Sequence, residues 1–98
     1  MRLYDVIWNE KFVAKIGQKH AVSTEEIEEV LFSRPHVRKL EKGKVQGEHL
    51  YVAYGQTAVG RYLVVFFIRK PRGAGLPISA CEMTGAERRY FHEQKKEG

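Results

Sequence analysis

Basic side chains and phenols are the groups in this 98-residue sequence that could do chemistry. Lysine, histidine and tyrosine accept or donate protons, and the planar arginine guanidinium holds a phosphate through two parallel hydrogen bonds. Because RNA carries its own nucleophile, the ribose 2′-hydroxyl, such groups could cleave it without a metal ion. Taken singly, the same groups are ordinary surface residues. The candidates are Lys19, His20, Arg61, Arg69, Lys70, Arg72, Arg88, Arg89, Tyr51, Tyr54 and Tyr90.

Other chemistries lack the residues that they need. The sequence has no Gly-x-Gly-x-x-Gly or Walker-type phosphate loop, so we expect no nucleotide cofactor. Four histidines without close ligand spacing and a single cysteine give no metal-site pattern, so no metal is expected. Cys81 has no second cysteine to pair with, and a lone cysteine on an apolar strand is more typical of a small core residue than of a nucleophile.

Positive charge is concentrated in the second part of the chain. The formal net charge is +5, yet residues 1–32 hold four basic and six acidic side chains, so residues 33–98 carry all of the excess. Such a surface attracts a polyanion, because each cation set against a phosphate releases counterions. The sequence shows no basic amphipathic helix with a broad apolar face for a membrane surface. The charge pattern therefore favours RNA or DNA as the partner.

Length and hydropathy indicate a single domain over residues 1–98, with a frayed tail after about residue 93. Hydrophobic residues make up 43% of the chain, which suffices for one small core. No stretch approaches the roughly 18 to 20 apolar residues of a membrane-spanning helix, and the polar first five residues do not resemble the start of a signal peptide. We therefore expect a cytoplasmic protein.

Three helices are predicted from their start signals. Asn9 precedes an amphipathic segment of about two to three turns, which predicts the first helix. Ser23 and Glu26 have the spacing of a capping box, in which each side chain bonds the other residue's backbone amide. Thr84 and Glu87 repeat that spacing, so we assign Glu87 to capping the third helix rather than to chemistry.

Strands account for the rest of the predicted structure. Residues 62–68 are seven apolar residues in a row, typical of a central strand covered on both faces, and residues 69–75 are interpreted as a basic loop. Strands joined by short turns pair antiparallel. The predicted fold class is therefore α+β, with an antiparallel sheet of about four to five strands packed against two N-terminal helices and one C-terminal helix. The predicted strands are residues 3–8, 36–40, 50–54, 62–68 and 76–81.

Short motifs in a fixed order, spread over almost the whole chain, resemble those of the BrnT family of bacterial toxins. That family has Lys-His-Gly before a capped helix, Gly-Arg before a long apolar strand, Ile-Ser-Ala-Arg, and Glu-Arg with a nearby Tyr. The matching segments are Trp8, Lys19-His20-Ala21-Val22-Ser23-Thr24-Glu25-Glu26, Gly55, Gly60-Arg61-Tyr62-Leu63-Val64-Val65, Ile78-Ser79-Ala80-Cys81-Glu82-Met83-Thr84 and Glu87-Arg88-Arg89-Tyr90.

The resemblance implies a RelE-like fold and a metal-independent endoribonuclease that blocks translation as the toxin of a type II toxin-antitoxin pair. It also implies a cognate BrnA-like antitoxin with a DNA-binding domain, which neutralises the toxin and represses the operon. Contact with DNA is then indirect, through that antitoxin. The antitoxin is expected to cover the basic face near Arg61, Arg69 and Arg88. RNA is the implied substrate.

The resemblance also narrows the candidate catalytic residues to six. Lys19 or His20 is the implied general acid or base, although His20 could instead cap the carbonyls at its helix end. Tyr90 would orient the substrate or stack on a base. The arginines that would hold the scissile phosphate are Arg61, Arg69 and Arg88, with Arg69 at or near the basic position that ends the central strand.

Three segments of the chain depart from the family pattern. Ala21 replaces a glycine, which we expect only to stiffen the turn between the first two helices. Cys81 stands where Ile-Ser-Ala is normally followed by arginine, and Leu76-Pro77 precede Ile78 where a basic residue is common. Loss of a phosphate-stabilising cation slows cleavage by orders of magnitude. The alternatives are therefore a weakened or inactive domain that only binds antitoxin or RNA, and a small α+β protein whose charge serves solubility alone.

Overall fold

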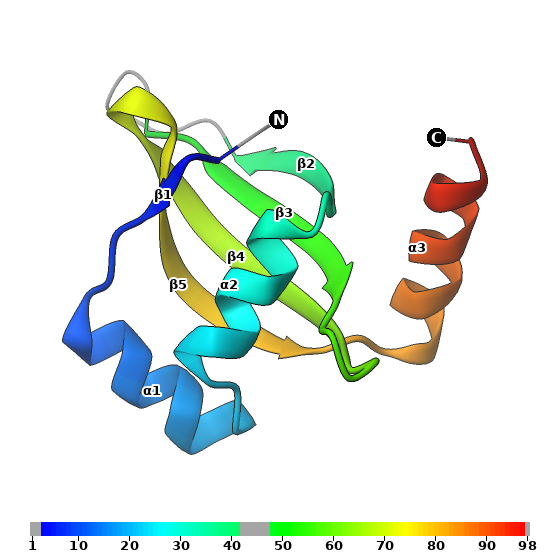
Figure 1. The fold of residues 1–98 in the computed structure, drawn as a ribbon, viewed down its shortest axis with the longest axis horizontal. Helices are drawn as coiled ribbons and strands as arrows, with labels where there is room; N and C mark the ends of the chain where they lie inside the picture. Colours follow the sequence, from blue (N-terminus) through cyan, green and yellow to red (C-terminus); the bar gives the residue numbers. More distant parts are fainter. Residues whose placement is uncertain (1–2, 42–47, 98) are drawn as a thin grey trace.

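The structure is a computed structural model that describes residues 3–41 and 48–97. Within these ranges five strands form one sheet in the order β1-β5-β4-β3-β2, with helices on both of its faces (Figure 1). This arrangement confirms the predicted α+β class with two N-terminal helices and one C-terminal helix. The elements are β1 (Asp5–Val6), α1 (Glu10–His20), α2 (Thr24–Phe32), β2 (His36–Glu41), β3 (Leu50–Gln56), β4 (Tyr62–Lys70), the 3-10 turn η1 (Pro71–Gly73), β5 (Ala74–Glu82) and α3 (Gly85–Glu97).

Side-chain caps fix where the three helices begin, as predicted. The Asn9 side-chain oxygen accepts hydrogen bonds from the first backbone amides of α1. Ser23 and Glu26 accept from each other's amide at 3.1 and 3.0 Å, and Thr84 and Glu87 do the same at 3.1 and 2.8 Å. These bonds satisfy amides that have no partner inside the helix. Local sequence therefore sets the helix starts.

Apolar side chains alternate along β4, so the central strand contributes to a core on each face. Leu63, Val65 and Phe67 pack under α1 and α2, and they are fully buried. Val64 lies on the opposite face in a second cluster with Phe91 of α3. The prediction of a central strand covered on both faces is confirmed, because successive strand residues point to opposite sides of the sheet.

The first strand differs from its prediction in length and direction. It comprises two residues, Asp5–Val6, and it pairs in parallel with the start of β5, whereas the other strand pairs are antiparallel. The sheet is therefore mixed rather than antiparallel. The antiparallel inference assumed short turns between neighbours, but β1 and β5 are separated by most of the chain.

The strands β4 and β5 and the helix α3 extend further than predicted. The expected basic loop over residues 69–75 is mostly strand, since β4 runs to Lys70 and β5 starts at Ala74, with only η1 between them. At the C-terminus, α3 continues to Glu97, beyond the expected end near residue 93. The Lys95 ammonium donates to the Arg34 carbonyl at 2.9 Å, so the last turns of this helix have a tertiary contact.

Candidate functional site

Arg61 lies just before β4, where acceptors from three elements surround its guanidinium. Nε donates to Glu82 at 3.1 Å, and Nη1 donates to both carboxylate oxygens of Glu26, the nearer at 3.0 Å. Nη1 also donates to the Ala21 carbonyl at 2.9 Å, and Nη2 donates to the His20 carbonyl at 3.2 Å. We call His20, Ala21, Glu26, Arg61 and Glu82 the Arg61 corner. It joins the turn between α1 and α2 to the ends of β4 and β5.

The charges in the Arg61 corner are mutually satisfied. The hydrogen bond from the Ser23 amide lowers the pKa of Glu26, and Arg61 lowers it further. Hydrogen bonding to Glu26 and then to Glu82 raises the pKa of Arg61. A phosphate at this position would have to displace carboxylates that already hold the guanidinium. The geometry thus gives Arg61 a structural role, whereas the family resemblance implied a phosphate ligand.

Ala21 has a second consequence that the sequence did not indicate. It is the C-cap of α1 in the left-handed region, with φ of 52°, and its amide donates to the Gly17 carbonyl. A residue with a Cβ costs roughly 1–2 kcal/mol in this conformation, which glycine adopts freely. The expectation that alanine would only stiffen the turn is therefore incomplete, because Ala21 also adds backbone strain.

The remaining predicted residues divide between the two ends of β4. Lys19 and His20 have exposed side chains at the end of α1, near Arg61. Arg88 places its guanidinium carbon 4.3 Å from the Tyr62 ring centroid, at that same end of the strand. Arg69 lies at the other end of β4, roughly 25 Å away for eight residues of extended chain. The six candidates therefore do not form a single site.

Tyr90 contributes instead to a cluster on the α3 side of the sheet. Its hydroxyl is 2.9 Å from Nε2 of His36, and its ring meets the Tyr54 ring edge-on at 5.1 Å between centroids. Nη2 of Arg38 donates to the Tyr54 hydroxyl at 3.2 Å, and its guanidinium carbon lies 5.5 Å from the Tyr90 ring centroid. We call His36, Arg38, Tyr54 and Tyr90 the His36 cluster.

Strand register explains how these four side chains meet. His36 pairs with Tyr54 across β2 and β3, and Arg38 lies two residues further along β2, so all three share one face. The third helix then places Tyr90 over that face. Burial lowers the pKa of His36, and the positive charges of Arg38 and Lys95 lower it further. The imidazole is therefore neutral at pH 7, which suits a proton acceptor.

Sequence reasoning singled out Tyr54 and Tyr90 but missed His36 and Arg38. Both lie on a segment predicted as a strand, and their spacing of two residues puts them on the same face. That alternation was the available signal. It did not identify the tyrosines as neighbours, because this depends on register and on where α3 docks.

Cys81 lies on the same face as the His36 cluster. It is paired with Val64 in β4, which is paired with Tyr54 and then His36, and it packs half-buried against the α3-side core as predicted for a core residue. Burial raises the pKa of its thiol, as does the nearby Glu87 carboxylate. The thiol is therefore protonated at neutral pH and supplies no cation to this face.

Residues 3–41 and 48–97 contain neither a metal-binding group of side chains nor a membrane-spanning helix. No group of three or more His, Cys, Asp or Glu side chains in these ranges could hold a metal ion. Likewise, no helix in these ranges is long and apolar enough to cross a membrane.

The arrangement of the elements defines a BrnT-like α+β fold. The structure aligns with the crystal structure of BrnT, the ribonuclease toxin of Brucella abortus, with a TM-score of 0.59, over 82% of this chain and 96% of that chain. The two sequences are 17% identical, so the likeness shows the fold alone. Neither a scan against protein-family models nor a search of curated proteins gave a match.

Proposed function

We propose that this chain is a toxin-type endoribonuclease that cleaves RNA without a metal ion at the His36 cluster. The observation that carries the proposal is the convergence of a neutral histidine, an arginine and two phenols on one face of a BrnT-like fold. These groups provide a proton acceptor, a proton donor and a cation, which are what RNA cleavage by its own 2′-hydroxyl requires.

The geometry supports a role for each side chain. In the tautomer whose Nε2–H donates to the Tyr90 hydroxyl, Nδ1 carries no proton and accepts the proton of the 2′-hydroxyl. The 2′-oxygen then attacks the phosphorus, and the bond to the 5′-oxygen breaks. Tyr90 gives its proton to that leaving oxygen and regains one from Nε2. Arg38, held by the Tyr54 hydroxyl, donates to the phosphorane oxygens.

A toxin of this kind would be held inactive by a cognate antitoxin in the cytoplasm. The fold likeness to BrnT supports this proposal. We propose that a BrnA-like antitoxin covers the His36 cluster, and that this chain meets DNA only through the antitoxin's own DNA-binding domain. Residues 1–98 act as one unit in this proposal.

Two specific observations favour alternatives. Lys19 and His20 are exposed at the end of α1, beside the Arg61 corner, so this end of the sheet is a second candidate site for the acid and base. The engagement of Arg61 by carboxylates, together with Cys81 in place of the family's arginine, favours a domain that binds antitoxin or RNA without cleaving.

Cleavage of a 5′-labelled single-stranded RNA in excess EDTA tests the proposal. We expect the parent chain to give products that end in a 2′,3′-cyclic phosphate, and His36→Gln to cleave at least about 100-fold more slowly. His92→Gln, which changes an exposed histidine of α3, is the matched control and should cleave like the parent.

The other outcomes separate the alternatives. If Lys19→Ala/His20→Ala abolishes cleavage while His36→Gln does not, the acid and base lie at the end of α1. If no variant and no parent sample cleaves RNA, yet the parent binds it, the chain is a binding module.

A further inference from the structure

A second basic region lies at the end of the sheet opposite the Arg61 corner. Where β4 turns into β5, a groove of about 540 Å³ opens beside η1. We call it the hairpin groove. It is lined by His49, Tyr51, Arg69, Lys70, Pro71, Arg72 and Gly73.

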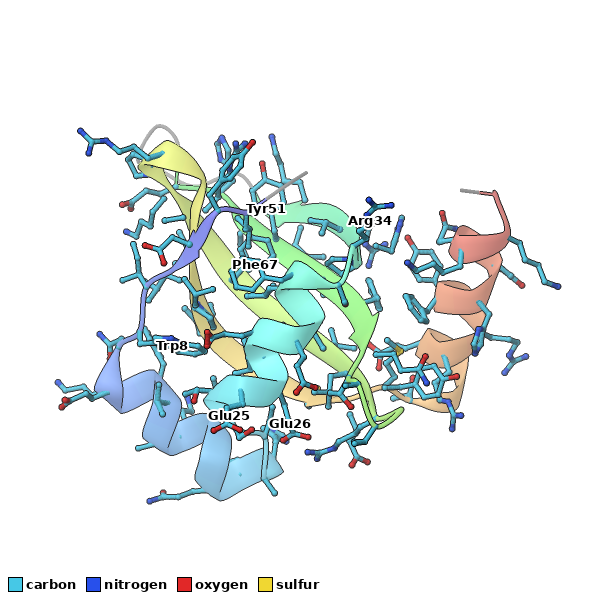
Figure 2. All side chains as sticks on the ribbon, viewed as in Figure 1. Trp8, Glu25, Glu26, Arg34, Tyr51 and Phe67 are labelled. Carbon is cyan, nitrogen blue, oxygen red and sulfur yellow. The ribbon has the colours of Figure 1, made fainter. Side chains whose placement is uncertain are left out.

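Two guanidinium groups in the hairpin groove have no acidic partner within residues 3–41 and 48–97. Arg69 and Arg72 are exposed, and neither forms an ion pair with any residue in the described ranges. Lys70, by contrast, is bound to Glu48 at 2.5 Å. The acidic residues at the start of α2, Glu25 and Glu26, lie at the far end of the sheet (Figure 2). Among the described residues, Arg69 and Arg72 are therefore without an ion pair, unlike Arg61 in its corner.

An aromatic surface adjoins these two arginines. The Tyr51 ring stacks on the Phe67 ring, with centroids 5.6 Å apart and planes inclined by 17° (Figure 2). Phe67 is fully buried, whereas Tyr51 is half-buried and lines the groove. A ring held flat in this way beside guanidinium groups suits stacking of a nucleobase.

The backbone presents Arg72 in an unusual and fixed conformation. Its φ is 64°, in the left-handed region that disfavours side chains, and Gly73 follows with φ of 73°. The Tyr4 amide donates to the Gly73 carbonyl at 2.9 Å, and a Cβ at Gly73 would lie 2.6 Å from the Tyr4 ring. Glycine would satisfy the backbone at position 72 without strain. The arginine at this position is thus costly to the backbone and available to a ligand.

We infer that the hairpin groove is a second RNA-binding site, which holds single-stranded RNA away from the His36 cluster. Arg69 and Arg72 contact backbone phosphates, and one base stacks on Tyr51. The inference rests on the proposed function insofar as RNA is the substrate, and it makes Arg69 a binding residue rather than a catalytic one. An acidic peptide would also meet the two arginines, but it would leave the Tyr51 ring unused.

Binding of a fluorescent 2′-O-methyl RNA strand tests the site independently of cleavage, because this strand has no free 2′-hydroxyl. Affinity is measured over a range of salt concentrations for the parent and for Arg69→Gln/Arg72→Gly. We expect the variant to bind about tenfold more weakly, with a salt slope smaller by about 1.4 for the two lost phosphate contacts. Lys11→Gln/Lys15→Gln removes the same charge from the exposed face of α1 and should retain the parent slope.

Folding and stacking are checked with separate variants. Arg72→Gly relieves backbone strain, so weaker binding in this variant together with an unchanged or higher Tm excludes unfolding as the cause. Tyr51→Phe should bind like the parent and Tyr51→Leu about tenfold more weakly, because only the aromatic ring stacks on a base.

The two proposals fail in different ways. A parent that binds the strand through the groove but cleaves no RNA contradicts the proposed function and leaves the groove assignment intact. The groove assignment is overturned if the parent does not bind the strand, if Arg69→Gln/Arg72→Gly keeps the parent affinity and salt slope, or if a poly-glutamate peptide of equal charge binds the groove more tightly than RNA.

Discussion

The Arg61 corner and the His36 cluster each join an arginine to side chains from distant parts of the chain, yet their partners differ in kind. At the corner the Arg61 guanidinium meets two carboxylates and two backbone carbonyls. In the cluster Arg38 meets aromatic rings and one hydroxyl, and its neighbour His36 has a lowered pKa.

This difference distinguishes an arginine that stabilises the fold, as in the Arg61 corner, from one that is available to a ligand, as in the His36 cluster. A guanidinium whose donors are all satisfied gains little from a phosphate and stabilises the fold by holding its partners. A guanidinium that lies over aromatic rings keeps donors for a ligand, and a perturbed histidine beside it indicates a functional site. Charge type alone does not distinguish the two cases.

The largest expected effect comes from Arg38→Ala. Without a cation for the phosphorane, RNA cleavage should fall by about 10²–10³-fold, whereas the free energy of unfolding should change by less than about 1 kcal/mol. Initial rates and urea denaturation measure the two quantities. Arg89→Ala, which removes an exposed arginine of α3, should leave both near the parent values. Parent-like cleavage by Arg38→Ala would contradict its assigned role.

Arg61→Ala should show the reverse pattern. Losing the hydrogen bonds to Glu26 and to the His20 and Ala21 carbonyls should lower the free energy of unfolding by about 2 kcal/mol, whereas the largely exposed Glu82 carboxylate adds little. The Tm should then fall by roughly 10 °C or more. Cleavage per folded molecule should persist. A variant as stable as the parent but unable to cleave would show that Arg61 contacts the substrate.

Helix caps provide a finer test of the same comparison. Ser23→Ala and Thr84→Ala should each cost about 1 kcal/mol. The Glu26 carboxylate serves both the Ser23 amide and Arg61, so Ser23→Ala and Arg61→Ala should be non-additive by about 0.5 kcal/mol or more. Thr84 caps a different helix, so the losses of stability caused by Thr84→Ala and Arg61→Ala should add. Equal additivity in the two double variants would argue against a shared network.

The smallest expected effect is on how stability depends on pH. The His36 cluster and the Arg61 corner should each lose stability in a different pH range. The folded-state pKa of His36 is below its ordinary value of 6.5, so the unfolded chain binds the proton first and stability falls as pH drops through this range. The pKa of Glu26 is below its ordinary 4.5, so its stabilisation is lost only at lower pH. Urea unfolding midpoints measured across pH test this. In His36→Gln the decrease in stability near the ordinary histidine pKa should disappear, whereas the decrease at lower pH, which comes from Glu26, should remain. An unchanged profile for His36→Gln would exclude the first assignment.

Local features of the fold were predictable from the sequence, whereas the site depended on long-range placement. The capping boxes at Ser23 and Thr84 use residues three positions apart, and the apolar run through β4 determines its own burial. By contrast, the pairing of Arg61 with Glu26 and Glu82 joins residues from three elements, which no local pattern encodes.

The candidate site could be predicted only in part for the same reason. Arg61 and Arg69 are close in sequence but far apart in space, because the extended strand between them places them at opposite ends of the sheet. His36 and Tyr90 are far apart in sequence, yet register and helix docking bring them to 2.9 Å. Family membership and the catalytic roles stay predictions, whereas the BrnT-like fold is confirmed by the structural alignment.

The parallel pair of β1 and β5 also affects how the chain folds. Antiparallel neighbours β2 to β5 follow one another along the sequence, so their contacts close short loops and can form early. Asp5 pairs with Ala74 across most of the chain, so this contact closes a much longer loop. We therefore expect the pairing of β1 to contribute little to the folding rate and to act mainly by slowing unfolding, because it holds the edge of the finished sheet.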